Sequence, residues 1–398
     1  MTNRRAFLSL ALSAPALHAA KYTHIQERLA KRNFEGLTRD DLPTPSMLLD
    51  LDAFERNVKR MADHNRAAGI ELRAHVKIHK SVDVSKRQVA AGARGVCCAT
   101  IAECELMAAA GVPNILYTAQ PAGREKILRA IALSKKHPTF TCVADDLGVA
   151  QQLESAAATD GAKLNMLVDV FAGLTRQGCQ PGETALKIGQ FIDKAQHLKL
   201  QGLMAYSGDA SHTKTFAARK QKSAADLAGM LASAELFKKS GLPTAVRSGG
   251  STGTYNIDVG SLTELQAGSY IFMDTAYLKV GGKSRDDVYE DFEPSLTVLT
   301  AVVSKTRAGV CSIDAGNKAT VRPTDQVKGR PDVTVENQGA EYAMLLWKDG
   351  GFEVGNRVEL YPTNLDTSTN VYDRYYVERG GKIIDAWPIM GRSGAAQR

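Results

Sequence analysis

The sequence lacks the patterns that mark several large classes of protein. Its six cysteines are too few and too irregularly spaced for a disulfide-rich scaffold or a zinc motif. We therefore expect the cysteines to be buried and to behave as small hydrophobic residues. No run of Lys and Arg accounts for the formal net charge of +7, which argues against a nucleic-acid partner. Beyond the N-terminal segment no stretch of roughly 18 apolar residues occurs, so we expect no membrane-spanning helix.

Two further absences bear on chemistry. All eight histidines lie in the first 212 residues, so nothing beyond His212 can supply an imidazole as a base or metal ligand. No Gly-x-Gly-x-x-Gly follows the first predicted strand of the main domain, which argues against a dinucleotide-binding sheet. What remains is a chain of 398 residues, 44% hydrophobic and 23% charged, long enough for one large domain or two.

The first twenty residues have the composition of an export signal. Arg4 and Arg5 precede an apolar, Ala-rich run that extends to about Ala20, and Ala14-Pro15-Ala16 offers a cleavage site. The paired arginines resemble a twin-arginine signal, which exports folded proteins. We predict a signal peptide over residues 1–20, a periplasmic location and no stable membrane insertion after its removal. If this interpretation is wrong, the protein is cytoplasmic.

Residues 70–275 alternate between short β-type runs and helical stretches. This alternation predicts a parallel sheet with right-handed crossovers, and eight such units fit an α/β fold of the (β/α)8 TIM-barrel type. An open doubly wound sheet is the alternative. The expected strands are Leu72–Lys77, Gly95–Thr100, Asn114–Thr118, Phe140–Ala144, Asn165–Val170, Leu200–Tyr206, Ala245–Gly249 and Leu265–Tyr270.

After Val280 the chain becomes rich in β-type runs with little helical pattern between them. We expect a barrel over residues 44–278 and a C-terminal, mostly antiparallel β domain over 279–392, with residues 21–43 packing on either. The expected strands of this β domain are Thr297–Val303, Gly309–Asp314, Glu341–Leu346, Arg357–Tyr361, Tyr375–Arg379 and Lys382–Ala386.

Two motifs at predicted strand ends point to one cofactor. Residues 73–80 read Arg-Ala-His-Val-Lys-Ile-His-Lys and place Lys77 among other cations, where crowding and burial lower a lysine pKa and favour attack on carbonyls. Residues 248–253 read Ser-Gly-Gly-Ser-Thr-Gly, a turn whose backbone N–H groups can bind phosphate. Taken singly, the first motif is also explained by a solvated basic loop and the second by a flexible loop. Together they are what pyridoxal phosphate requires.

These motifs occur with others that are jointly specific. They are Thr-Pro-Ser-Met-Leu-Leu-Asp-Leu-Asp at 44–52, Gly-x-x-Arg-x-Gly at 173–178, Thr-Glu-Leu-Gln-Ala-Gly-Ser-Tyr at 263–270, Asp-Ala-Gly at 314–316, Asn-Val-Tyr-Asp at 370–373 and Asp-Ala-Trp-Pro at 385–388. In this respect the sequence resembles the D-threonine aldolase/D-serine dehydratase family over roughly residues 44–392. The family comprises fold-type III pyridoxal-phosphate enzymes related to alanine racemase. The resemblance implies a barrel with a C-terminal β domain, often paired into homodimers with the site near the interface.

The resemblance also implies individual roles. Lys77 would form the Schiff base with pyridoxal phosphate, Arg176 would face the cofactor oxygen and Tyr206 would lie near the pyridine ring. The phosphate would be held by a glycine-rich turn and a following loop, made up of Gly249, Gly250, Ser251, Thr252, Gly268, Ser269 and Tyr270.

The sequence departs from the family where its members bind a metal. They carry Pro-x-His-x-Asp/Cys in the C-terminal domain, whereas this chain has Asn364 in place of the His, followed by Asp366. Two further family histidines are replaced by Ser207 and Tyr342. One carboxylate and one amide oxygen can hold Mn²⁺ or Mg²⁺ only weakly and form a poor zinc site.

The leading prediction is a lyase that cleaves a β-hydroxy-D-amino acid to glycine and an aldehyde, with His212 as the base for the β-hydroxyl proton. A dehydratase acting on D-serine or a 3-hydroxy-D-amino acid is the first alternative. A racemase with Tyr342 as second base and a non-catalytic pyridoxal-phosphate-binding protein are the others. A small-molecule D-amino acid is the expected partner under the enzymatic hypotheses.

Overall fold

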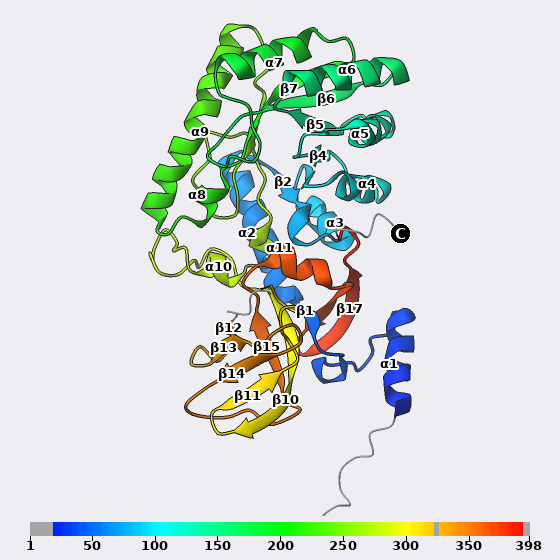
Figure 1. Ribbon diagram of the computed structural model, residues 1–398, viewed down its shortest axis with the longest axis vertical. Helices are drawn as coiled ribbons and strands as arrows, with labels where there is room; N and C mark the ends of the chain where they lie inside the picture. Colours follow the sequence, from blue (N-terminus) through cyan, green and yellow to red (C-terminus); the bar gives the residue numbers. More distant parts are fainter. Residues whose placement is uncertain (1–18, 322–325, 393–398) are drawn as a thin grey trace, which may run out of the picture.

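The computed structural model describes residues 19–321 and 326–392, which form a barrel and a β domain lying end to end (Figure 1). Eight parallel strands close into the barrel in sequence order, and the last pairs with the first through Glu264 and Glu71. All eight expected strands are present, so the predicted TIM barrel is confirmed. The strands are β2 (Glu71–His75), β3 (Gly95–Cys98), β4 (Leu116–Tyr117), β5 (Thr141–Ala144), β6 (Leu164–Asp169), β7 (Leu198–Ala205), β8 (Val246–Gly249) and β9 (Glu264–Leu265).

Helices cover the outside of the barrel, and local sequence signals set their ends. The Asp50 carboxylate caps the first of them by accepting from the Ala53 N–H at 3.0 Å, and Gly69 ends it in the left-handed conformation. The covering helices are α2 (Leu51–Ala68), α3 (Val82–Ala90), α4 (Ile101–Ala109), α5 (Arg124–Lys136), α6 (Leu147–Asp160), α7 (Glu183–Lys194) and α9 (Phe216–Lys239).

The interior of the barrel is packed with apolar side chains and crossed by one buried ion pair. Arg73 of β2 donates from Nε to Glu264 of β9 at 3.0 Å, and both side chains are almost completely buried. Arg73 belongs to the basic run noted in the sequence, but it points into the barrel and joins the first strand to the last. All six cysteines are buried and unpaired, as expected.

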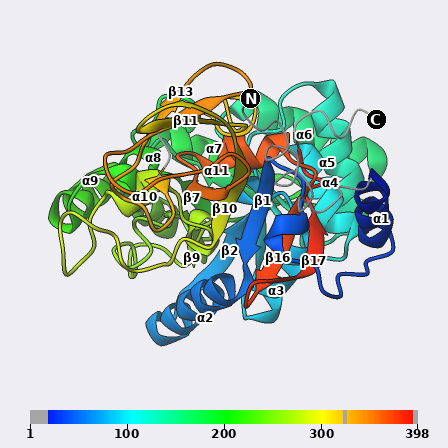
Figure 2. The ribbon, with the colours of Figure 1, turned by 90° about the horizontal axis from the view of Figure 1, so that it is seen from below.

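The β domain contains a strand that the sequence analysis assigned to the barrel. β1 (Ser46–Asp50) lies between β10 (Leu296–Arg307), to which it is antiparallel, and β16 (Arg374–Arg379), to which it is parallel (Figure 2). The barrel therefore begins after Asp50, later than the expected boundary at residue 44. The other strands of this sheet are β11 (Val310–Ile313), β12 (Gln326–Val327), β13 (Thr334–Asn337), β14 (Ala343–Leu346), β15 (Arg357–Tyr361) and β17 (Lys382–Pro388).

The segment that precedes β1 packs on the β domain. Helix α1 (Ala19–Ala30) contributes Leu29 to an apolar cluster with Leu37, Leu299 and Tyr376. This result decides between the two placements left open for residues 21–43. Residues 1–18, which hold most of the predicted signal peptide, lie outside the described part of the chain.

Short helices fill the junction between the two bodies. Helix α11 (Leu365–Ser368) of the β domain lies against the 3₁₀ turn η2 (Val76–Ile78) that follows β2, and α10 (Thr275–Leu278) lies beside it (Figure 1). The junction thus adjoins the carboxyl ends of the barrel strands. Among the described residues no helix is long and apolar enough to cross a membrane.

Candidate functional site

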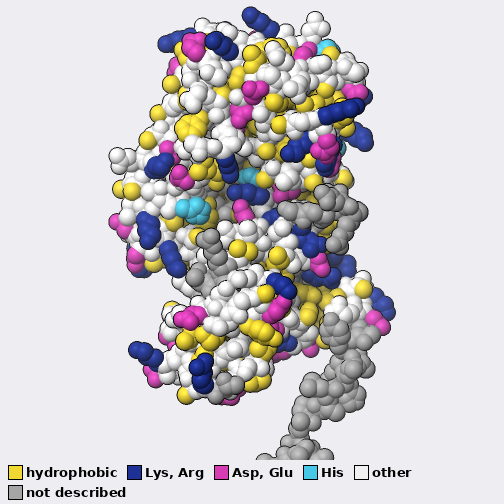
Figure 3. All heavy atoms as spheres, in the orientation of Figure 1, with side chains coloured by type: hydrophobic (Ala, Val, Ile, Leu, Met, Phe, Trp, Pro, Cys, Tyr) yellow, Lys and Arg dark blue, Asp and Glu magenta, His cyan; other side chains and the backbone are white. Residues whose placement is uncertain are grey.

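A cavity of about 170 Å³ opens at the carboxyl ends of the barrel strands. This is the end at which barrel enzymes place their chemistry. On the face shown in Figure 3, histidine side chains and charges of both signs gather on the barrel near the narrow junction with the β domain. The cavity is lined by His75, Lys77, Ala99, Thr118, Ala119, Arg176, Gln177, Met204, Tyr206 and Gln266.

Lys77 projects into this cavity from η2. The turn starts where β2 ends, and His75 caps it by accepting the Lys77 N–H on Nδ1 at 3.3 Å. The Lys77 amine lies 5.8 Å from the centre of the Tyr206 ring and 3.3 Å from Oδ2 of Asp366. Burial lowers the pKa of Lys77, but Tyr206 and Asp366 outweigh it, and the pKa is raised above its ordinary value. The predicted lowered pKa is therefore wrong for the cofactor-free chain.

Two histidines of the basic run are buried next to Lys77. Burial, followed by the charges of Lys77 and other nearby cations, holds the pKa of His75 well below its ordinary value. Burial lowers the pKa of His79 to about 3. Both rings are thus neutral at physiological pH, and His75 offers an uncharged aromatic surface within the cavity.

Tyr206 and Arg176 line the same cavity and lie close to each other. Tyr206 directly follows β7, and the guanidinium carbon of Arg176, from the loop after β6, lies 5.3 Å from the centre of its ring. The phenol ring therefore has two cations near it, the Lys77 amine and the Arg176 guanidinium.

The glycine-rich turn lies at the same end of the barrel, beside Tyr206. Gly249 pairs with Ala205, and a Cβ on Gly249 would stand 2.1 Å from the Ala205 carbonyl oxygen. Gly250 follows with a φ of +70°, a conformation that favours glycine. Ser251 and Thr252 are buried, and Ser251 donates its N–H to Thr254 Oγ1 at 3.1 Å. The turn is therefore closely packed.

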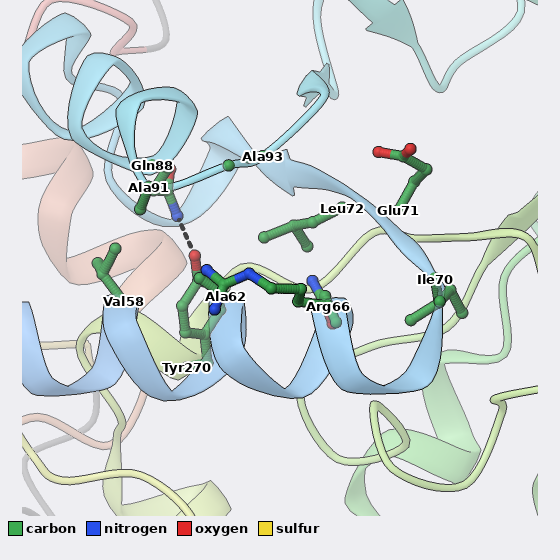
Figure 4. A pocket seen from close by; sticks show the side chains of 13 residues that line it. Val58, Ala62, Arg66, Ile70, Glu71, Leu72, Gln88, Ala91, Ala93 and Tyr270 are labelled. Carbon is green, nitrogen blue, oxygen red and sulfur yellow. Dashed lines mark hydrogen bonds between the residues drawn. The ribbon is translucent and has the colours of Figure 1, made fainter.

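The following loop approaches the cavity through its backbone. A Cβ on Gly268 would come within 3.0 Å of His75, and Ser269 begins the next 3₁₀ turn. The Tyr270 N–H donates to Thr252 Oγ1 at 3.0 Å, but its phenol points to the other end of the barrel, where Gln88 donates to it at 2.9 Å (Figure 4). There it lines a separate cavity of about 330 Å³ between α2 and α3. Only the Tyr270 backbone lies where the resemblance placed the residue.

His212, the predicted base, ends the short helix α8 (Gly208–His212) and lies 4.3 Å from the ring centre of Tyr277. Burial and the charge of Lys77 lower its pKa, and Asp366 opposes them. His212 is therefore neutral near pH 7 and able to accept a proton, and it lies close enough to Lys77 and Asp366 to be influenced by their charges.

The residues expected to bind a metal make other contacts. Asn364 is the N-cap of α11, and its Oδ1 accepts from the Thr367 N–H at 3.2 Å and from the Thr367 hydroxyl at 2.9 Å. Asp366 Oδ2 faces Lys77, and Asp366 Oδ1 is buried without a hydrogen-bond partner among the described residues. Within residues 19–321 and 326–392 no group of three His, Cys, Asp or Glu side chains is placed to hold a metal.

Two ammonium groups adjoin the Asp366 position. Besides Lys77, Lys80 donates from Nζ to the Asp366 carbonyl oxygen at 2.8 Å and to Thr369 Oγ1 at 3.2 Å. Two unit charges about 4 Å apart interact by about 4 kcal/mol at an effective dielectric constant of about 20, and a divalent ion doubles this repulsion. The donor set and its surroundings therefore do not fit a divalent metal.

Sequence reasoning missed several residues of the site. Gln177 donates to Asp169 Oδ2 and to the Thr118 carbonyl oxygen, both at 2.8 Å, and Gln266 donates to Ser248 Oγ at 2.9 Å. Gln266 directly follows β9, and Gln177 lies next to Arg176 in the Gly-x-x-Arg-x-Gly motif, and these positions are the signals that could have identified them. The contact between Lys77 and Asp366 has no local signal, because most of the chain separates them.

Comparison with known proteins agrees with this fold. Residues 49–276 match the alanine racemase N-terminal domain, and residues 295–378 match a putative serine dehydratase domain. A 3-hydroxy-D-aspartate aldolase of Paracoccus denitrificans (strain Pd 1222) is 35% identical over 367 residues, which cover 90% of this chain and 94% of that protein.

Two solved structures are similar over nearly their whole length. D-threonine aldolase from Filomicrobium marinum has a TM-score of 0.85 and 31% identity, covering 89% of this chain and 97% of that one. A D-threo-3-hydroxyaspartate dehydratase variant in its metal-free form has a TM-score of 0.80 and 27% identity, covering 88% of this chain and 98% of that one. The chain belongs to the D-threonine aldolase/D-serine dehydratase family, whose barrel is that of alanine racemase.

Proposed function

We propose that this protein is a pyridoxal-phosphate-dependent lyase that cleaves a β-hydroxy-D-amino acid to glycine and an aldehyde. The observation that carries the proposal is the Lys77 amine in a cavity at the carboxyl end of the barrel, facing Tyr206 and Arg176. The relatives named as aldolases support the choice of reaction.

The residues around the cavity fit pyridoxal phosphate. Lys77 would bind its aldehyde carbon, the neutral His75 ring and Tyr206 would contact its ring, and Arg176 would approach its phenolic oxygen. The turn from Gly249 to Thr252, with the loop that begins at Gly268, would hold the phosphate. When bound, the cofactor supplies a sink for the electron pair left on Cα as the Cα–Cβ bond breaks.

His212 is the proposed base. The lowered pKa leaves its imidazole uncharged, so it can take the proton of the substrate β-hydroxyl while the hydroxyl oxygen becomes the aldehyde carbonyl. Lys77 would hold the cofactor, and its amine would lie close enough to the reacting atoms to hold or pass a proton.

Dehydration is the second candidate, because a relative of similar fold is named D-threo-3-hydroxyaspartate dehydratase. The products separate the two reactions. Cofactor-loaded protein is incubated with D-threonine, and acetaldehyde and 2-oxobutyrate are measured. We expect acetaldehyde with an equivalent of glycine. Formation of 2-oxobutyrate would assign the dehydratase, and cofactor binding without either product would contradict both.

We also infer that the protein is exported, from the Arg4-Arg5 pair and the apolar run that follows it. Expression of the full chain with cell fractionation tests this inference. We expect a shortened product in the periplasm, and Arg4→Lys together with Arg5→Lys should retain the full-length chain in the cytoplasm.

A further inference from the structure

We infer that Asp366 is the carboxylate partner of the Lys77 amine and not a metal ligand, so that the cleavage in this protein proceeds without a divalent cation. The inference rests on the proposed function and deepens it, because it concerns how the same site performs the reaction. It follows from the contacts that residues on and beside α11 and η2 make with one another.

The first contact is that of Asn364. Its side-chain oxygen, the only acceptor it could offer a cation, already accepts two hydrogen bonds from Thr367 and thereby starts α11. A cation could recruit this oxygen only by removing the cap from a helix of four residues. If the cap is kept, Asp366 is left as the single side-chain ligand from this segment.

The second contact fixes Asp366 against Lys77. Lys80 binds the carbonyl oxygens of both Lys77 and Asp366, and buried Asp274 accepts the Leu365 N–H at 3.4 Å. These bonds tie α11 to η2 and to α10, and they orient Asp366 so that Oδ2 lies 3.3 Å from the Lys77 amine. The carboxylate therefore occupies the place of a counter-ion.

A counter-ion at this point has a use in the reaction. The β-hydroxyl proton passes to His212, the hydroxyl oxygen becomes the aldehyde carbonyl, and the electron pair of the Cα–Cβ bond passes to Cα. A proton from the Lys77 ammonium then completes glycine. Asp366 acts as a positioning residue that holds the Lys77 amine in place through Oδ2.

The test on the unaltered protein has a readout that does not depend on turnover. The cofactor-loaded full chain is dialysed against EDTA and then metal-free buffer. Bound metals are measured by mass spectrometry, and Mn²⁺ binding is measured by calorimetry. We expect far less than one equivalent of metal, no Mn²⁺ binding at micromolar concentrations, and release of aldehyde that neither EDTA nor Mn²⁺ changes. One equivalent of tightly bound metal, or activity lost in EDTA and restored by Mn²⁺, would overturn the inference.

A variant tests the contact with Lys77. Asp366→Asn removes the charge, so the visible absorbance of the Schiff base should form at lower pH when pyridoxal phosphate is added, while the total cofactor bound is retained. Turnover should fall on the order of a hundredfold. Asp209→Asn makes the same change at an exposed position of α8, and it should change neither the pH at which the absorbance forms nor the turnover. The other titratable or charged groups that face Lys77 are His75, Lys80, Arg176, Tyr206 and His212.

The outcomes separate this inference from the proposed function. Aldehyde formed only in the presence of Mn²⁺ would leave the lyase standing and refute the metal-free site. No aldehyde under any condition would refute the lyase, and the metal analysis would still decide whether Asp366 binds a cation. An unshifted pH dependence in Asp366→Asn would refute the pairing with Lys77.

Discussion

At the scale of single residues, the proposed chemistry depends most on one amine. Lys77 is the described lysine whose amine lines the cavity at the barrel mouth, so Lys77→Ala should abolish aldehyde release and the Schiff-base absorbance together. Lys86→Ala, at an exposed position of α3, is the matched control and should behave like the unaltered protein. Both variants are measured by visible absorbance and product formation. Turnover that persists in Lys77→Ala would refute the mechanism.

His212 is the second residue whose replacement should affect the reaction. His212→Asn removes the proposed base but keeps a polar side chain at the end of α8, and we expect a loss of kcat on the order of 10²- to 10⁴-fold. Cofactor binding should be retained. His137→Asn, after α5 and away from the cavity, serves as control. A kcat within a few-fold of the unaltered protein would assign the proton transfer to another group.

Asp169 should make stability depend on pH. Burial, followed by the charge of Asp145, raises its pKa from the ordinary 3.8 to about 8. Between these values the unfolded chain releases the proton and the folded chain keeps it, so this residue's contribution to stability falls as pH rises from about 4 to about 8 and is constant above that. Asp169→Asn should therefore gain stability relative to the unaltered protein over this range. Thermal unfolding of the cofactor-free chain at several pH values measures it, with exposed Asp193→Asn as control. A pH-independent difference would contradict this expectation.

At the scale of secondary-structure elements, the buried pair of Arg73 and Glu264 holds the closing strands of the barrel together. Glu264→Gln leaves the Arg73 guanidinium buried without its counter-ion, which typically costs about 3–5 kcal/mol. Glu71→Gln, on β2 directly opposite in register but exposed, should cost little. The free energy of unfolding in urea compares the two. Equal stabilities would mean that the ion pair does not hold the barrel closed.

The elements also show what sequence reasoning can reach. Helices separate the first seven barrel strands from one another, so alternation predicts them, but no helix lies between β8 and β9. Residues 46–50 were placed within the barrel domain and not predicted as a strand, because only their pairing with β10 and β16 shows where they belong. Asn364 was interpreted as a metal ligand although Asn before a short helix is also a capping signal. The raised pKa of Lys77 depends on Asp366, a neighbour that only the tertiary structure provides.

At the scale of the whole molecule, the barrel and the β domain share one core. A single apolar cluster includes Phe54 of α2, Leu72 of β2, Val298 of β10 and Trp387 of β17. Because these side chains pack together, we expect one cooperative unfolding transition. Calorimetry and circular dichroism should give coincident midpoints, and two separated transitions would show that the domains are independent.

The position of β1 has a consequence for how the protein is made. Met47 emerges from the ribosome long before its parallel neighbour Tyr375. The place beside β1 therefore stays vacant until β16 has been made, and this edge of the apolar β1 has to be kept from other partners until then. A nascent chain stalled before β16 would therefore hold β1 paired with β10 on one side only, with its other edge open.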